Sequence, residues 1–159
     1  MLPYRYTLSC LLFSTSILAG NLDNDKMLKS VNTLRAQPQV CGSAKMPAVG
    51  PLTWNKTLQA VAEEHSKDMA EGDFLSHTGS NDSSPDERIT KQGYIWSAWA
   101  ENVAAGQHGV DAVLEAWMRS EGHCKNMMDP MVTQMGAGFV EKSDTEYEIY
   151  WTQTFAKPR

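Results

Sequence analysis

Four groups of side chains in this 159-residue chain are of types that carry chemistry: His77, Glu101, His123 and the pair Ser120 and Glu121. Two histidines and one carboxylate that converge from separate segments would suit a divalent cation with one open coordination position. Sequence spacing does not establish this convergence, because His77 and His123 lie far apart along the chain. A shared site is therefore a prediction about the fold.

The same residues allow two other interpretations. Ser120, His123 and Glu101 could imitate a hydrolase triad, and Cys124 beside His123 could imitate a thiol nucleophile with its base. Nothing local indicates an activated serine, and the sequence has no His-Glu-x-x-His, Gly-x-Ser-x-Gly, P-loop or Gly-x-Gly-x-x-Gly motif. His65 lies on the apolar stripe of a helix, where a histidine is more often a hydrogen-bonded core residue.

The first twenty residues have the layout of a cleaved secretory signal. Arg5 is their only charge, an apolar run covers 8–19, and polar residues follow at 21–25. The run is too short to span a bilayer. We expect cleavage between Ala19 and Asn21, and an uncleaved hydrophobic anchor is the alternative. The mature protein, with no transmembrane segment, is then expected to be secreted, either extracellular or periplasmic.

Charge and cysteine content narrow the function classes. The formal net charge is −5 and no basic patch is visible, so nucleic acid is not an expected partner. Removing the signal also removes Cys10 and leaves Cys41 and Cys124. Two cysteines in an exported chain most economically form one disulfide. That bond would consume the Cys124 thiol, which argues against a nucleophilic cysteine.

Hydrophobic periodicity predicts helices first and strands later, which is typical of an α+β fold with helices that cover an antiparallel sheet. We expect Gly122 to end the fourth helix as its C-cap, which would place His123 just beyond that helix. Gly136 and Gly138 indicate close approach of another segment to one strand face. The expected helices are 25–36, 56–72, 85–92 and one ending near 120, with a further turn at 126–130; the expected strands are 100–104, 136–140 and 147–155, and 37–51 is expected to be a loop.

Four motifs in this order resemble the CAP superfamily, which includes cysteine-rich secretory proteins, insect antigen 5 and plant pathogenesis-related proteins of class 1. The motifs are Leu-Ser-His at 75–77, Ala-Glu-Asn-Val-Ala at 100–104, Trp-Met-Arg-Ser-Glu-Gly-His at 117–123 and Tyr-Trp-Thr-Gln-Thr-Phe at 150–155. The resemblance places a domain at 25–156. It implies an α-β-α sandwich, with a three-stranded antiparallel sheet between helical layers.

The resemblance also implies a cleft lined by two histidines and two acids. His77, Glu101 and His123 match three of these positions, whereas Ser120 occupies the fourth and Glu121 follows one residue later. The site therefore has three ligands, or Glu121 substitutes from a shifted position. Members of the family are associated with divalent cations, with sterols or lipids, and with proteolysis, and no single activity follows from the fold.

We therefore predict a secreted, monomeric, non-enzymatic binding module whose His/Glu cleft holds a divalent cation, above all zinc. Glu101 would be a ligand or would orient a histidine from outside the coordination sphere. One alternative is a metal-assisted hydrolase in which Glu101 is the general base. Others are a lipid or sterol carrier with an apolar groove between helices, and a polar cluster that only stabilises the fold. The ligand is unknown, with a lipid or a cell-envelope component as candidates.

Overall fold

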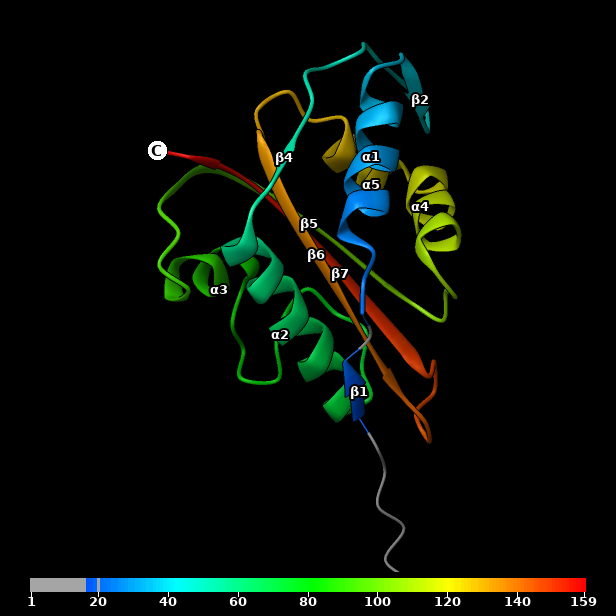
Figure 1. The fold of residues 1–159 in the computed structure, drawn as a ribbon, viewed down its shortest axis with the longest axis vertical. Coiled ribbons are helices and arrows are strands. Elements are labelled where there is room, and N and C mark those ends of the chain that lie inside the picture. Colours follow the sequence, from blue (N-terminus) through cyan, green and yellow to red (C-terminus); the bar gives the residue numbers. More distant parts are fainter. Residues whose placement is uncertain (1–16, 20) are drawn as a thin grey trace, which may run out of the picture.

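The computed structural model describes residues 17–19 and 21–159, so most of the expected signal segment lies outside the described residues. One sheet lies between two groups of helices (Figure 1), which confirms the predicted α+β class. One sheet face is covered by α1 (Asn24–Arg35), α4 (Val110–Arg119) and α5 (Glu121–Met127), and the other by α2 (Lys56–Gly72) and α3 (Pro85–Lys91).

The prediction of a three-stranded sheet is wrong, because two short strands extend the three long ones. The long antiparallel strands are β5 (Trp96–Ala105), β6 (Gln134–Lys142) and β7 (Ile149–Pro158). The order is β1-β6-β7-β5, with β1 (Ile17–Ala19) antiparallel to β6 and β4 (Thr53–Trp54) parallel to it. The β4 pairing arises where the chain enters α2, since the Thr53 and Asn55 amides donate to the carbonyls of Thr133 and Met135.

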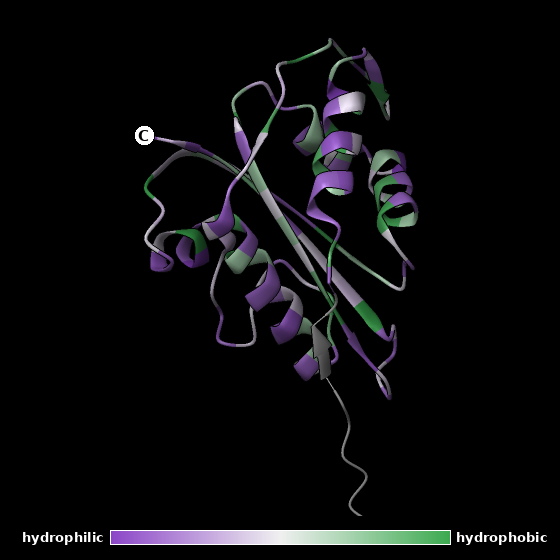
Figure 2. Ribbon diagram, in the orientation of Figure 1, coloured by the Kyte–Doolittle hydropathy of each residue, from purple (hydrophilic) through white to green (hydrophobic). Residues whose placement is uncertain are grey.

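Side chains of β7 point alternately to the two faces of the sheet and contribute to the hydrophobic core on each face. Trp151 and Phe155 pack in the cluster shared with α1, α4 and α5, whereas Tyr150 packs against α2. This is the alternation expected for a strand that is buried on both faces. Trp117, on the stripe of α4, is fully buried in the same core cluster as Trp151, as expected for two core residues. Figure 2 shows the matching pattern on the helices, with hydrophilic residues along the visible side of α2.

The stretch 37–51 was expected to be a loop throughout, but it contains a short β-hairpin. β2 (Gln39–Cys41) and β3 (Ala44–Met46) pair antiparallel. Gly42 makes the turn with a φ of 61°, a conformation that glycine adopts without a Cβ penalty. Strands of three residues are too short to produce a readable period, so the sequence pattern missed them.

The expected helix stop at Gly122 is also wrong. Helix α4 ends at Arg119, because Ser120 is extended with φ of −90° and ψ of 124°. The chain then turns directly into α5, so Gly122 and His123 lie inside a second short helix. His123 is therefore positioned by a helix rather than by a cap.

The two glycines of β6 do lie where another segment comes close. A Cβ on Gly136 would lie 2.1 Å from the Gln59 backbone nitrogen, and one on Gly138 would lie 2.8 Å from that of Glu63. Helix α2 therefore crosses β6 at backbone distance. Within the described part of the chain, no helix combines the length and apolar character needed to cross a bilayer.

Gly136→Ala should lower the free energy of unfolding by about 1–3 kcal/mol or more, because the added methyl group must displace the α2 backbone. Gly50→Ala is the matched control, since nothing lies within 4 Å of a Cβ at that position. Urea denaturation of both variants measures the difference. Equal stability of the two would contradict the close approach of α2 to β6.

Candidate functional site

The candidate site is built on β5, the edge strand of the sheet. Glu101 and Val103 face α2, whereas Asn102 faces the opposite side and contacts α5. This follows from the two-residue period of a strand. Glu101 is only 3% exposed, so a carboxylate sits inside the protein and requires compensating partners.

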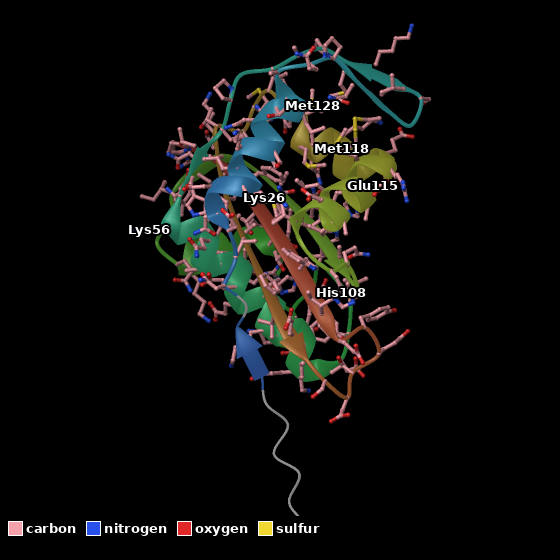
Figure 3. The ribbon with its side chains drawn as sticks, turned by 45° about the vertical axis from the view of Figure 1, so that its right-hand side comes forward. Lys26, Lys56, His108, Glu115, Met118 and Met128 are labelled. Carbon is pink, nitrogen blue, oxygen red and sulfur yellow. A yellow bond between two sulfur atoms is a disulfide. The ribbon has the colours of Figure 1, made fainter. Side chains whose placement is uncertain are left out.

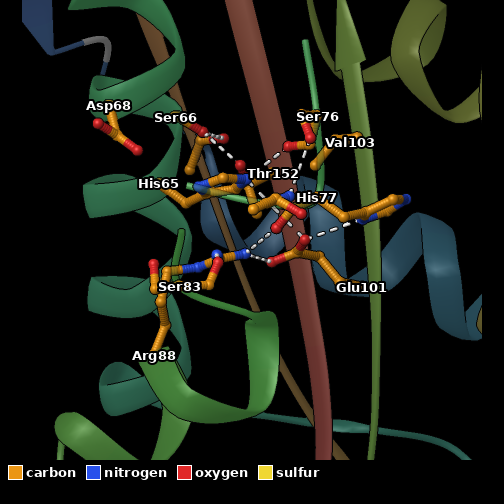
Figure 4. Close-up of polar contacts among 12 residues, drawn as sticks. His65, Ser66, Asp68, Ser76, His77, Ser83, Arg88, Glu101, Val103 and Thr152 are labelled. Carbon is orange, nitrogen blue, oxygen red and sulfur yellow. Dashed lines mark hydrogen bonds and ion pairs between the residues drawn. The ribbon is translucent and has the colours of Figure 1, made fainter. Parts of the chain in front are cut away.

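Two basic residues engage the two oxygens of Glu101 (Figure 4). His77 donates from Nδ1 to Oε1 at 2.9 Å, and Arg88 donates from Nη2 to Oε2 at 2.8 Å. The His77 side chain is half exposed. Its bond to Glu101 through Nδ1 fixes the orientation of the ring, and Nε2 is the ring nitrogen that Glu101 does not contact. A carboxylate that holds one imidazole nitrogen is the usual support for a histidine that binds metal through the other.

The loop that carries His77 is held at three backbone carbonyls. His65 of α2 bonds through Nε2 to the Ser76 carbonyl at 2.8 Å. Arg88 of α3 donates to the carbonyls of His77, at 2.9 Å, and Ser83, at 2.8 Å. His65 therefore acts as a buried, hydrogen-bonded residue, in agreement with the structural role expected for it.

Helix α5, which carries His123, is fixed at its C-terminal end and by a covalent bond. Cys41 and Cys124 form the predicted disulfide, which links β2 to α5 with a Cα–Cα distance of 5.4 Å. The buried Arg35 of α1 donates to the carbonyls of Met127, at 2.6 Å, and Asp129, at 3.0 Å. A cation at this end satisfies carbonyls that a helix leaves unbonded.

An amide network joins α5 directly to β5. Asn126 donates to the Glu101 carbonyl at 3.0 Å and to Asn102 Oδ1 at 2.9 Å. Asn102 donates in turn to the His123 carbonyl at 3.2 Å and to Gln153 Oε1 at 3.0 Å. The backbone of His123 is thereby placed against the strand that carries Glu101.

Electrostatics favours the neutral imidazole of His123. Burial, and then the nearby charge of His77, lower the pKa of His123. The neutral imidazole is the form that binds metal ions.

The structure gives the remaining candidates other contacts. Glu121 pairs with Lys125 of its own helix at 2.5 Å, a contact that lowers its pKa, and its side chain lies against Gly42 of the β2–β3 turn. Glu101 bonds His77 rather than His123, which leaves the triad interpretation without support. The disulfide removes the Cys124 thiol as a nucleophile. In residues 17–19 and 21–159, no three His, Cys, Asp or Glu side chains converge as a ready metal site.

The contacts of Glu101 argue against its serving as a third metal ligand beside the two histidines. Both oxygens of Glu101 are engaged by Arg88 and His77, so its carboxylate is poorly placed to coordinate an ion. Two imidazoles suit zinc or copper better than magnesium, which prefers oxygen ligands. His77 and His123 would then hold the cation, with water or a ligand group in the other positions.

Sequence reasoning missed three residues that position the site: Arg88, Asn126 and Arg35. A signal existed for Arg88, because a glutamate inside an apolar strand needs a cationic partner. Asn126 and Arg35 act on backbone carbonyls, and their role depends on where helices end and which strand lies beside them.

Stability should fall as pH drops below about 6.5, the ordinary pKa of histidine in the unfolded chain. Burial lowers the pKa of His65 in the folded protein. Below pH 6.5 the unfolded chain therefore binds a proton at His65 that the folded protein does not bind. The free energy of unfolding keeps falling until the pH reaches the lower pKa of His65 in the folded protein. We expect His65→Gln to flatten this dependence in urea denaturation between pH 8 and 5. If the free energy of unfolding of the variant fell equally steeply with pH, His65 would not be the cause of this dependence.

Comparison with known proteins places the chain in a family. The family model described as the cysteine-rich secretory protein family, CAP, matches residues 28–155. The Bacillus subtilis protein YkwD is 35% identical over 105 residues, which is 66% of this chain and 39% of YkwD. The B. subtilis membrane protein YlbC is 31% identical over 106 residues, 67% of this chain and 29% of YlbC. The chain thus spans less than two fifths of either relative.

Solved structures show the same fold. An extracellular SCP-domain protein from Bacillus anthracis superposes with a TM-score of 0.68 at 27% identity, covering 84% of this chain and 40% of its own. An outer surface protein from Borrelia burgdorferi gives a TM-score of 0.68 at 20% identity, covering 89% of this chain and 100% of its own. Since the family match extends over most of the sequence, the chain belongs to the cysteine-rich secretory protein family, CAP.

Proposed function

We propose that the protein is an extracellular binding domain in which His77 and His123 hold a divalent cation of the zinc type. The observation that most supports this proposal is the buried Glu101 carboxylate, which accepts hydrogen bonds from His77 Nδ1 and from Arg88. In this arrangement Glu101 orients His77 from outside the coordination sphere. The extracellular and outer-surface relatives support the location.

Two observations favour binding over hydrolysis. A hydrolase of this design would use Glu101 as general base on a metal-bound water, but both oxygens of Glu101 already accept hydrogen bonds and the residue is 3% exposed. The alternative is a hydrolase, in which Glu101 would give up its hydrogen bond with His77 or Arg88 and accept one from water instead. It predicts turnover of a substrate, which the binding domain does not.

A lipid or sterol carrier receives less support. Such a protein should expose apolar residues on a pair of helices that form a groove. Among the described residues, the exposed large apolar side chains lie on loops and strands instead. They are Val40, Leu75, Ile95, Trp99 and Met131.

Calorimetric titration of zinc tests the proposed site. We expect His77→Ala and His123→Ala each to weaken binding most, because each removes a ligand. Glu101→Gln should weaken it by about 10–100-fold, the usual effect of a group that orients a ligand. Glu121→Ala is the matched control and should change the affinity least, since its carboxylate contacts Lys125 and the β2–β3 turn.

Magnesium should bind more weakly than zinc in the same titration, as imidazole ligands predict. Zinc affinity that is unchanged in the His77→Ala/His123→Ala double variant would reject the site. The polar cluster around Glu101 would then have a purely structural role.

A further inference from the structure

An exposed apolar surface lies where the chain leaves α3 and enters β5. Ile95 is 72% exposed, more than any other large apolar side chain among the described residues, and Trp99 is 36% exposed. The segment lies beside the C-terminal end of β7 (Figure 1), where the Arg159 amide donates to the Ile95 carbonyl at 3.0 Å. Large apolar groups that gather at one place on the surface indicate a contact site.

A β-bulge places two tryptophans on the same face of β5. The pairing of β5 with β7 shifts between Trp96 and Ala98, so Ser97 is an extra residue in the strand. Without this residue, side chains three positions apart would point to opposite faces. The indole rings of Trp96 and Trp99 instead meet edge to face, with their centroids 6.4 Å apart. The two rings therefore belong to one surface.

An open groove of about 410 Å³ continues this surface. Its lining includes Tyr94, Ile95 and Trp96, and Arg159 is the only charged side chain among the residues that line it. Trp96 Nε1 donates to Thr90 Oγ1 at 3.0 Å, so the polar edge of this indole is already hydrogen-bonded. Amphipathic rings of this kind suit a boundary between water and an apolar phase.

The side-chain charge around the groove is opposite in sign to that of the whole molecule. The formal net charge is −5, yet residues 88–100 and 149–159 contain four basic side chains and no acidic one. Two of the four pair with acids from other segments. The other two, Lys157 and Arg159, are exposed and form no ion pair among the described residues. An anionic partner is therefore favoured at this end of β7.

Apolar, aromatic and cationic side chains on one surface suit a lipid surface with anionic headgroups. Aromatic rings settle at the level of the headgroups, and basic side chains are attracted to anionic lipids. A small soluble anion would leave the apolar groups in water, and a neutral apolar partner would leave the two cations unused. We propose that Ile95, Trp96, Trp99, Lys157 and Arg159, here called the β5 corner, dock the protein on an anionic lipid surface.

Co-sedimentation with lipid vesicles tests the proposal, in a buffer with EDTA so that no divalent cation bridges protein and lipid. We expect binding to vesicles of equal parts phosphatidylcholine and phosphatidylglycerol, weakened by added salt, and little binding to phosphatidylcholine alone. Ile95→Ser should lower the partition coefficient by about tenfold, because it removes the most exposed apolar group. Val40→Ser is the matched control, since Val40 is 67% exposed but lies on β2.

A second pair of variants tests the charges of the β5 corner. Lys157→Gln/Arg159→Gln should weaken binding by about fivefold for each charge removed. Lys29→Gln/Lys45→Gln is the matched control, because it changes the net charge equally at two exposed lysines elsewhere. Equal loss in both double variants would overturn the proposal by showing that the overall charge controls binding. Circular dichroism checks that every variant is folded.

Binding should persist in the His77→Ala/His123→Ala variant, since neither histidine lines the groove. Loss of binding in that variant would assign the lipid contact to the cation site and overturn the proposal. Absence of sedimentation with either kind of vesicle would also overturn it, as would equal binding to neutral and anionic vesicles. If Ile95→Ser and Val40→Ser bound equally well, the docking surface would lie elsewhere on the molecule.

Discussion

Replacing both Cys41 and Cys124 with alanine is expected to lower the free energy of unfolding by about 4–5 kcal/mol. The disulfide spans a sequence separation of 83, and in the chain-entropy model closing so long a loop strongly restricts the unfolded chain. The two cysteines are fully buried and pack with Met128 and the partly buried Met118 (Figure 3), so the variant also loses packing around the sulfurs. Urea denaturation of the double variant measures the loss.

Reductant provides the control for this experiment. It should shift the unfolding midpoint of the wild-type protein toward that of the variant and leave the variant unchanged. Identical midpoints of wild type and variant under oxidising conditions would contradict the stabilising role. Two free thiols found by mass spectrometry in protein from an oxidising compartment would contradict the bond itself.

Trp117→Ala should destabilise the protein by about 3–5 kcal/mol, the usual cost of truncating a buried tryptophan. The ring of Trp117 is fully buried between α4 and the sheet, and its Nε1 donates to the Val103 carbonyl at 3.1 Å. The variant loses both this packing and a partner for an edge-strand carbonyl. The shift in the urea midpoint measures the combined effect.

Trp99→Ala is the matched control, because Trp99 lies on β5, the strand whose Val103 carbonyl Trp117 contacts, but is 36% exposed. Its truncation should cost clearly less. Trp117→Phe should fall between the two, since it keeps most of the packing but loses the hydrogen bond. An unchanged midpoint in Trp117→Ala would contradict the placement of α4 against the sheet.

The sequence predicted the elements whose side chains repeat over several turns or strand residues. The stripe of α2, with its cap at Asn55, and the alternation along β7 were readable because burial imposes a period on each. The close approach at Gly136 was readable for another reason, namely that a strand interior rarely contains glycine without a steric need.

The short elements could not be predicted in the same way. β4 has two residues and exists through backbone hydrogen bonds with β6, which leave no pattern in side-chain type. The break between α4 and α5 depends on the extended backbone of Ser120, a residue that also occurs inside helices. Tertiary contacts therefore set these boundaries, and the local sequence carries little information about them.

The sequence offered His77, Glu101 and His123 as candidate cation ligands, and it left two roles open for Glu101, that of a ligand and that of a residue which orients a histidine. The structure distinguishes them, because Glu101 is buried and held by Arg88 whereas His77 is half exposed. Arg88 lies on a separate helix, so its contact with Glu101 depends on how α3 packs on β5.

The most direct test of the proposed cation site is anomalous diffraction at the zinc edge from crystals of the zinc-loaded protein. We expect a peak about 2.0–2.1 Å from one imidazole nitrogen of His77 and one of His123. Glu101 should still bond His77 Nδ1 and Arg88, outside the coordination sphere. A zinc ion bound directly by the Glu101 carboxylate, or a peak that contacts neither histidine, would contradict this account.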